Sequence, residues 1–260
     1  MPEASVKGTQ IHFLEKKGTS SFPVLFIHGS GGNAFAWEKV MDGLDGFHVI
    51  AIDLPGHGQS KGEGKRTIPE YTEFIRDFCD ARGIGEVVLG GHSLGGGIVL
   101  DFALRFPGRL KAALLMGTGA RLKVVPAALD LLKKMAEGSI PPKFEPWAFS
   151  EKATPEVLAE GEREWAKTSS KVRYYDMMAC DHFDVMGELG KIKCPSLIVC
   201  GREDRLTPVK YSEFLRSKIA GSRMEIIEGA AHMPMLETPG ALSSVLANFL
   251  KTFSKAPTPE

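Results

Sequence analysis

Ser93 lies in a pattern that could make its hydroxyl a nucleophile. Residues 91–95, Gly-His-Ser-Leu-Gly, match G-x-S-x-G, in which the glycines allow a tight turn and a close approach of helix to strand. The serine follows a short apolar run, residues 87–89, and opens an apolar helical pattern, residues 94–106. This strand, turn and helix order predicts a nucleophile; a helix N-cap serine is the alternative.

The same pattern occurs a second time around Ser60, in residues 58–62. Ser60 lies in a polar loop with Gly and Lys, and no apolar helix follows it. We therefore interpret Ser60 as a loop residue and Ser93 as the candidate nucleophile.

A serine hydroxyl attacks efficiently only when a neighbouring base takes its proton, and a histidine is the usual base. Two histidines follow Ser93. His182 lies within a long helical stretch, whereas His232 lies in the loop after the last apolar run, residues 224–227. Because ligands bind beyond the carboxyl ends of parallel strands, we predict that His232 is the base.

The acid that orients this base is expected in a loop between the two. Asp204 comes just after the apolar run 197–200, and its neighbour Glu203 is the competing carboxylate. We predict Asp204, which would fix the tautomer of His232 and stabilise its charged form. Asp181 and Asp184 are expected to bond backbone amides instead.

Acyl transfer also needs donors for the developing oxyanion, and backbone amides commonly supply them. One comes from the residue after the nucleophile, here Leu94. The other comes from the loop after the first parallel strand, residues 28–32 (His-Gly-Ser-Gly-Gly), in which the amide of Ser30 is our prediction. A flexible turn without this role is the alternative.

Short apolar runs closed by glycine alternate with helical patterns along the chain, which predicts an α/β fold with a mostly parallel, buried sheet flanked by helices. The segment 10–16 is expected to pair antiparallel at the sheet edge. Residues 123–190 interrupt the alternation with helical periodicity alone, too long for a connecting loop. We predict a core of residues 1–122 and 191–260 and an inserted helical cap of residues 123–190.

Five motifs together resemble the α/β-hydrolase superfamily, in particular its small capped serine-nucleophile branch of carboxylesterases, carbon–carbon bond hydrolases and cofactor-free haloperoxidases. The resemblance covers nearly the whole chain, although the cap matches only in size. It implies the α/β-hydrolase fold, a triad of Ser93, Asp204 and His232, and no cofactor. The motifs are residues 28–32, 53–60 (Asp-Leu-Pro-Gly-His-Gly-Gln-Ser), 91–96, 201–204 (Gly-Arg-Glu-Asp) and 229–232 (Gly-Ala-Ala-His).

The cap and the residues just after the glycine loop (residues 28–32) carry apolar side chains that could line a substrate pocket over Ser93, although most of those in the cap are expected to pack it onto the core. Arg163, Lys171 and Arg173 could bind a carboxylate and are expected on solvated faces. The candidate pocket residues are Phe35, Trp37, Trp147, Trp165, Met178 and Phe183.

Composition excludes several other classes of function. Lys and Arg number 32 and Asp and Glu 32, so no net charge attracts nucleic acid or an anionic membrane surface. No run of about 18 apolar residues predicts a membrane span, and residues 1–9 lack the features of a signal peptide. The histidines and the four cysteines have no metal-ligand spacing, so no metal is expected. Buried cysteines and the missing leader favour the cytoplasm, and the oligomeric state stays open.

The leading hypothesis is a carboxylic-ester hydrolase acting on small to medium, largely apolar substrates through an acyl-enzyme on Ser93. A carbon–carbon bond hydrolase, a thioesterase or a perhydrolase on the same triad is the alternative. Carbon–carbon hydrolases commonly have Gly-Pro-Gly-Ala where residues 31–34 are Gly-Gly-Asn-Ala, which lowers their weight. A small-molecule sensor that retains the triad is the alternative from another class.

Overall fold

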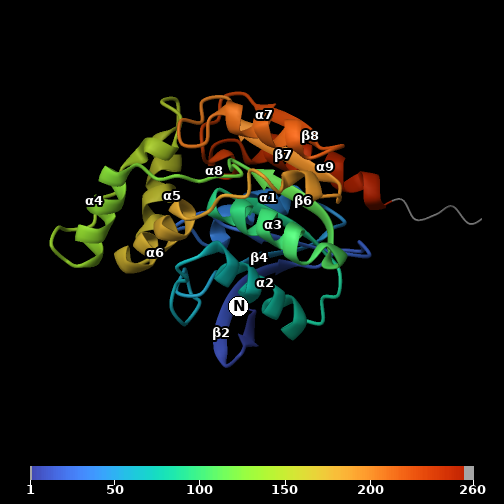
Figure 1. The fold of residues 1–260 in the computed structure, drawn as a ribbon, viewed down its shortest axis with the longest axis horizontal. Helices are drawn as coiled ribbons and strands as arrows, with labels where there is room; N and C mark the ends of the chain where they lie inside the picture. The colour runs from blue at the N-terminus through green and yellow to red at the C-terminus, as the bar shows by residue number, and fades with distance from the viewer. Residues whose placement is uncertain (1, 255–260) are drawn as a thin grey trace, which may run out of the picture.

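The computed structural model describes residues 2–254, which form a single eight-stranded sheet with helices on both faces (Figure 1). The strand order is β1-β2-β4-β3-β5-β6-β7-β8. Strands β3 to β8 are parallel, β2 is antiparallel to β4, and β1 is antiparallel to β2. The predicted mostly parallel sheet is thereby confirmed. The strands are β1 (Glu3–Val6), β2 (Thr9–Lys16), β3 (Pro23–Ile27), β4 (His48–Ile52), β5 (Val87–His92), β6 (Leu110–Met116), β7 (Ser196–Gly201) and β8 (Arg223–Ile227).

Helices connect these strands and shield the sheet. Four short 3-10 helices, η1 (Ala34–Trp37), η2 (Pro107–Arg109), η3 (Pro146–Ala148) and η4 (Leu189–Lys191), lie in the loops. The α-helices are α1 (Glu38–Asp42), α2 (Ile68–Ala81), α3 (Leu94–Arg105), α4 (Pro126–Ala136), α5 (Pro155–Trp165), α6 (Ser170–Asp181), α7 (Val209–Lys218), α8 (Pro234–Glu237) and α9 (Pro239–Ser254).

Alternate residues of each central strand enter two separate cores. In β3, Leu25 and Ile27 belong to the core beneath α2, α3 and α7, whereas Val24 and Phe26 belong to the core beneath α1 and α9. Successive side chains of a strand point to opposite faces, so a strand covered on both sides must be apolar throughout. This explains why the sequence shows continuous apolar runs instead of alternation.

The sheet edge differs from the expectation. Residues 10–16 do form an antiparallel strand, β2, but β2 is the second strand and the edge is β1. Lys7 and Gly8 join the two strands with φ values of 47° and 82°, as in a type I′ hairpin turn. β1 has only four residues, of which Ala4 and Val6 are apolar and only Val6 is buried, so it is too short to be recognised from an apolar pattern.

The carboxyl ends of β3 and β5 lie side by side at the point where the strand order reverses. Chain segments leave β3 toward β4 on one side and leave β5 toward β6 on the other. Pairing of Ile27 with Gly91 brings the loops that follow these two strands together. In open α/β sheets this crevice is the expected place for a ligand.

The segment between β6 and β7 contains α4, α5 and α6, which gather on one side of the molecule (left in Figure 1). Helix α6 is anchored, because Ala179 and Cys180 belong to the core beneath α2 and α3. Helix α4 packs against α6 and leaves Leu131 partly exposed. The division into a core and a cap of residues 123–190 stays a prediction. Within residues 2–254, no helix is both long and apolar enough to cross a membrane.

Candidate active site

Ser93 occupies the sharp turn between β5 and α3, with φ 53° and ψ −115°. A non-glycine residue rarely adopts a positive φ, and such strain persists only where the surroundings enforce it. Here Ser93 N donates to Met116 O (3.0 Å), and Thr118 Oγ1 donates to Ser93 O (2.8 Å). Both backbone groups of the serine are therefore tied to the end of β6 and the loop after it. This turn has the conformation of a nucleophile elbow.

Asp204 and His232 are directly hydrogen bonded, with His232 Nδ1 2.8 Å from Asp204 Oδ2. Both side chains are buried, and they come from the loops after β7 and β8. The carboxylate also accepts from Thr207 Oγ1 (2.8 Å) and from the amides of Leu206 and Thr207 (2.8 Å each). Burial alone would raise the pKa of Asp204, but the hydrogen bond and charge of His232, together with the hydrogen bonds from Thr207, hold it well below its ordinary value. Asp204 is therefore a carboxylate able to orient the imidazole.

The loop that carries His232 is held from three directions. Glu237 Oε1 accepts from the amides of Ala231 (3.1 Å) and Met233 (3.1 Å), on either side of the histidine. His232 N donates to Ala148 O (2.9 Å) of η3. His92 Nε2 donates to His232 O (2.8 Å), and burial lowers the pKa of His92 to about 3, so His92 is a neutral support.

Of the two predicted oxyanion donors, Ser30 lies in the loop after β3 and Leu94 begins α3. A Cβ placed on Gly29 would be 3.2 Å from Ser93 Cβ, which shows how closely the loop after β3 approaches the serine. Leu94 is the first residue of α3, where amides have no acceptor within the helix. Over residues 2–254, neither Leu94 N nor Ser30 N donates to a protein acceptor, and Ser93 Oγ makes no protein hydrogen bond. A serine, an oriented histidine and two unpaired amides can together perform acyl transfer.

The sequence profile of the alpha/beta hydrolase fold family matches residues 23–239. The chain belongs to that family. A 2-hydroxy-6-oxononadienedioate/2-hydroxy-6-oxononatrienedioate hydrolase of Escherichia coli K12 is 27% identical, covering 95% of this chain and 93% of the relative. Among solved structures, a thermophilic esterase is 33% identical with a TM-score of 0.83, covering 98% of each chain. A thermophilic esterase from Thermogutta terrifontis is 25% identical with a TM-score of 0.86, covering 98% of this chain and 99% of that one. Family and relatives support hydrolase activity.

The competing residues of this alpha/beta hydrolase family member lie in other surroundings. Glu203 Oε2 accepts from Ser150 Oγ (2.6 Å) and has no contact with His232. His182 is the exposed C-cap residue of α6. Ser60 Oγ donates to Asp53 O (2.8 Å) and accepts from His12 N (2.9 Å), as a structural loop serine does. The structure thus brings Asp204, and not Glu203, to His232.

Asp181 and Asp184 bond backbone amides, as expected, and His28 has a bracing role of its own. Asp181 Oδ1 accepts from Val124 N (3.1 Å), and Asp184 Oδ1 accepts from Met186 N (3.1 Å). His28 braces two loops, donating from Nδ1 to Gly29 O (2.7 Å) and accepting at Nε2 from the amide after Asp53 (3.1 Å). Burial lowers the pKa of His28 to about 4, aided by the charge of His57, and so keeps it neutral.

The candidate pocket residues are dispersed. Trp37 is a correction: it is 0% exposed and stacks on Phe26 in the core beneath α1 and α9, with ring centroids 4.6 Å apart, so it cannot line a pocket. Its place in η1, directly after the glycine loop, gave no sign that it faces the core. Phe183 is buried beside Gly97 in the other core. For the remaining residues the lining role stays a prediction: Phe35, Trp165 and Met178 are half-buried, and Trp147 is 58% exposed.

One of the expected solvated cations is also a correction. Arg163 and Lys171 are exposed, but Arg173 is 5% exposed, lies over the ring of Trp165 at 3.7 Å and donates to Trp165 O (2.8 Å) and to Thr168 O. Burial lowers the pKa of Arg173 to about 10. A helix with a charged, aromatic-rich sequence does not reveal which of its cations points inward.

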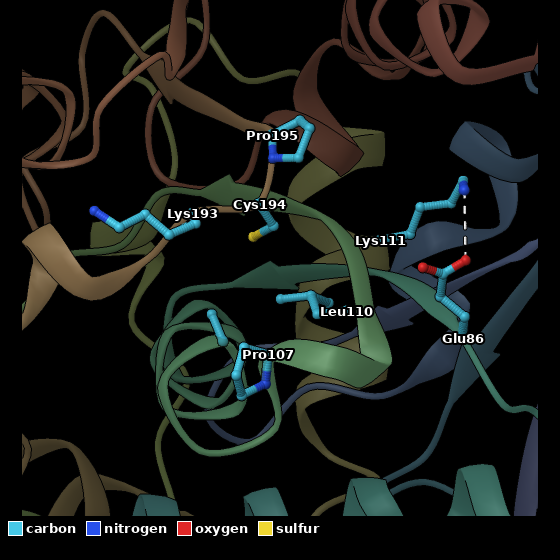
Figure 2. A pocket seen from close by; sticks show the side chains of 8 residues that line it. Glu86, Pro107, Leu110, Lys111, Lys193, Cys194 and Pro195 are labelled. Atoms are coloured by element: carbon cyan, nitrogen blue, oxygen red, sulfur yellow. Dashed lines mark hydrogen bonds and ion pairs between the residues drawn. The ribbon is translucent and has the colours of Figure 1, made fainter.

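Figure 2 shows a surface pocket at the opposite end of the sheet. It lies where β5, β6 and β7 begin, whereas Ser93 follows the end of β5. Lys111 and Glu86, at one side of it, form an ion pair (3.4 Å). Its position at the amino ends of the strands separates it from the candidate chemistry. Its lining residues are Glu86, Ala103, Pro107, Leu110, Lys111, Lys193, Cys194 and Pro195.

Sequence reasoning missed two residues that hold the site. Thr207 contacts both Asp204 and the ring of His232, with Oγ1 3.3 Å from Nδ1, and its position three residues after Asp204 in the same loop was an available signal. Asp176 accepts from Gly31 N (2.8 Å), 145 residues away in the chain, and no local pattern indicates that contact.

Proposed function

We propose that the protein hydrolyses carboxylic esters through an acyl-enzyme on Ser93. The observation that carries the proposal is the hydrogen-bonded Asp204–His232 pair at the same strand ends as a serine with φ 53°. The esterases among its structural relatives, one of them 33% identical, support an ester as the substrate.

In the first half-reaction, Ser93 Oγ attacks the carbonyl carbon and its proton passes to His232 Nε2. The tetrahedral oxyanion accepts hydrogen bonds from the amides of Ser30 and Leu94. Asp204 stabilises the imidazolium through Nδ1. As the intermediate collapses, His232 gives the proton to the leaving alcohol, and the acyl group remains on Ser93.

The second half-reaction repeats these steps with water. His232 takes a proton from water as the oxygen attacks the acyl carbon, and the same amides hold the second oxyanion. Collapse returns the proton to Ser93 Oγ and releases the carboxylic acid. The partner implied is a small-molecule ester, and none of the steps requires a metal or cofactor.

The test combines turnover with covalent labelling. Initial rates on para-nitrophenyl esters of increasing acyl length are measured for the native protein, Ser93→Ala and Ser60→Ala, together with labelling by a fluorophosphonate located by mass spectrometry. We expect Ser93→Ala to lower kcat by about 10⁴-fold or more and to abolish labelling. Ser60→Ala removes the other G-x-S-x-G serine and is expected to remain labelled at Ser93. Equal rates for the native protein and Ser93→Ala would sink the proposal.

A carbon–carbon bond hydrolase is the second candidate, because the Escherichia coli relative is named as a hydrolase of dienedioates and trienedioates. Against it, the glycine loop continues as Gly-Asn-Ala, and Asn33 caps η1 and donates to Glu164 Oε2 (3.1 Å). A vinylogous diketone assayed in parallel separates the two. Inactivity on every ester with turnover of the diketone would replace the ester proposal.

A further inference from the structure

Gly31, the residue after the proposed oxyanion donor, is held by one face of helix α6. Its amide donates to Asp176 Oδ2 (2.8 Å). A Cβ on Gly31 would lie 2.7 Å from Cγ of Arg173, so the backbone of Gly31 is in close contact with the Arg173 side chain. Arg173 and Asp176 are three residues apart and therefore lie on the same side of the helix. The inserted segment thus touches the glycine loop directly beside Ser30.

The bond to Asp176 constrains a peptide that could otherwise turn over. Gly32 N donates to Gly29 O (3.0 Å), which closes a turn over residues 29–32, and Gly31 has φ +66° at its third position. A type II turn has this positive φ, whereas a type I turn has the central peptide reversed. Glycine tolerates both. An acceptor fixed opposite Gly31 N selects one orientation and so restricts the conformation of Ser30.

Asp176 is itself fixed by a complete set of donors. The side chain is 0% exposed, and besides Gly31 N it accepts from Tyr71 Oη (2.6 Å, to Oδ1) and His57 Nε2 (2.9 Å, to Oδ2). These donors come from α2 and the loop after β4, both parts of the sheet-bearing core. A buried carboxylate is stable only when paired and hydrogen bonded in this way.

The charge of Asp176 is balanced. Burial alone would raise its pKa, but the charge and hydrogen bond of His57, with the other donors, lower it. Burial alone would lower the pKa of His57, but Asp176 raises it. A carboxylate beside a protonated imidazole adds little net charge near the place where an oxyanion would develop.

We infer that Asp176 is a positioning residue that, from helix α6, fixes the Ser30–Gly31 peptide and so keeps Ser30 in the conformation from which its own amide, in the preceding peptide, binds the oxyanion. The inference rests on the proposed ester hydrolysis. It assigns to the inserted segment a part in the chemistry itself, in addition to any covering of the substrate.

The test uses the full chain with Asp176→Ala, the milder Asp176→Asn and, as a matched control, Asp181→Ala. Asp181 is on the same helix and also accepts a backbone amide, that of Val124, but not one beside Ser93. Three quantities are measured: kcat and KM on a para-nitrophenyl ester, inhibition by a trifluoromethyl ketone that forms a tetrahedral adduct with serine, and hydrogen–deuterium exchange of the peptide spanning residues 28–34.

For Asp176→Ala we expect kcat to fall about 10- to 100-fold and ketone inhibition to weaken in parallel, because both depend on the oxyanion donors. KM should stay near its native value, and exchange in residues 28–34 should accelerate. Asp176→Asn retains an oxygen that can face Gly31 N and should lie between Asp176→Ala and the native protein. Asp181→Ala should match the native protein in all three quantities.

The inference is overturned if a folded Asp176→Ala protein has the same hydrogen–deuterium exchange in residues 28–34, or the same kcat, as the native protein. If Asp176→Ala does not fold, the test uses Asp176→Asn instead. The inference is then overturned if Asp176→Asn equals Asp181→Ala in kcat, ketone inhibition and exchange. Failure of the proposed function is distinguishable, because then the native protein itself neither hydrolyses esters nor is labelled at Ser93. The role of Asp176 in oxyanion binding falls with it in that case, while the exchange data still decide whether Asp176 constrains the loop.

Discussion

Glu203 and Asp204 are adjacent carboxylates with different partners, and the difference follows from where each side chain points. Asp204 Oδ2 meets His232 Nδ1 and Thr207 Oγ1, whereas Glu203 Oε2 meets Ser150 Oγ. In a charged state beside the imidazole, Asp204 fixes which nitrogen carries the proton and so leaves Nε2 free to act as a base.

Replacing each carboxylate by the corresponding amide separates the roles of Asp204 and Glu203. We predict that Asp204→Asn lowers kcat on an activated ester by about 10³- to 10⁴-fold, because an amide can hold the wrong tautomer of His232. Glu203→Gln should change kcat by less than about threefold, since its partner is a serine of the inserted segment. The measurement is steady-state kinetics on both variants, after circular dichroism has established that each is folded. Equal losses in the two variants would contradict the assignment of the acid.

At this scale, sequence reasoning succeeds where a residue directly follows a strand. The strands β5, β7 and β8 are visible as apolar runs, and the polar residues after them converge because parallel strands end at one edge. It fails for Asp176, whose partners Gly31, His57 and Tyr71 come from three distant segments. Nothing in the surrounding helical sequence distinguishes a buried aspartate from an exposed one.

The β5–turn–α3 element places Ser93 by excluding side chains around it. A Cβ on Gly91 would lie 2.6 Å from Gly96 N, and one on Gly95 would lie 2.7 Å from His28 O. Backbone atoms cannot move aside as the end of a flexible side chain can. The glycines of this element therefore let α3 pack onto β5 and β3 at backbone distance.

A glycine scan tests this packing. We predict that Gly95→Ala lowers the free energy of unfolding by about 3 kcal/mol or more, because the methyl group overlaps the backbone at the end of β3. Gly240→Ala, in α9, is the matched control, because a Cβ there meets nothing within 4 Å. It should change that free energy by less than about 1 kcal/mol. Urea denaturation of both variants gives the comparison, and a Gly95→Ala protein as stable as Gly240→Ala would show that the helix can shift.

Element prediction depends in the same way on what covers each segment. The parallel strands β3 to β7 are nearly continuous apolar runs because both of their faces are buried, whereas β8, at the edge of the sheet, is only partly buried. β1 pairs with β2 across the Lys7-Gly8 turn and buries only Val6, so its four residues give too short a signal. Trp37 was misplaced for a related reason: η1 bends directly after the glycine loop, and its aromatic residues divide between the core and the surface.

On the scale of the whole molecule, a layer of buried histidines joins the glycine loop, the loop after β4 and the candidate active site. The rings of His28 and His57 have centroids 4.7 Å apart, and those of His92 and His232 4.6 Å apart. Among residues 2–254, no three His, Cys, Asp or Glu side chains are grouped as metal ligands. Instead, the rings of His28, His57 and His92 form hydrogen bonds to backbone carbonyl groups and so fix the loops. The structure of the site therefore depends on the protonation state of these histidines.

This coupling predicts an acid-sensitive fold. Burial lowers the pKa of His28 to about 4 and that of His92 to about 3, so between these values and about 6.5 an unfolded chain binds protons that the folded chain does not. The free energy of unfolding is therefore expected to fall as pH decreases from about 6.5, by up to about 1.4 kcal/mol per pH unit for each histidine. His57 acts with the opposite sign: its pKa is raised by Asp176, so its stabilisation is complete below about 6.5 and is lost as pH rises through the raised value.

Stability should accordingly be greatest near pH 6.5, with an acidic limb and an alkaline limb along which the free energy of unfolding falls on either side. A single substitution should flatten one of these limbs. Urea denaturation from pH 4.5 to pH 9, for the native protein, His28→Asn and Asp176→Asn, measures this at about half-unit steps. His28→Asn removes one group that resists protonation, so its acidic limb should be shallower than the native one, whatever its absolute stability. Asp176→Asn removes the partner that raises the pKa of His57, so its alkaline limb should flatten. Parallel profiles for all three proteins would mean that these rings titrate alike in the folded and unfolded chains, and would contradict the shifts in their pKa values.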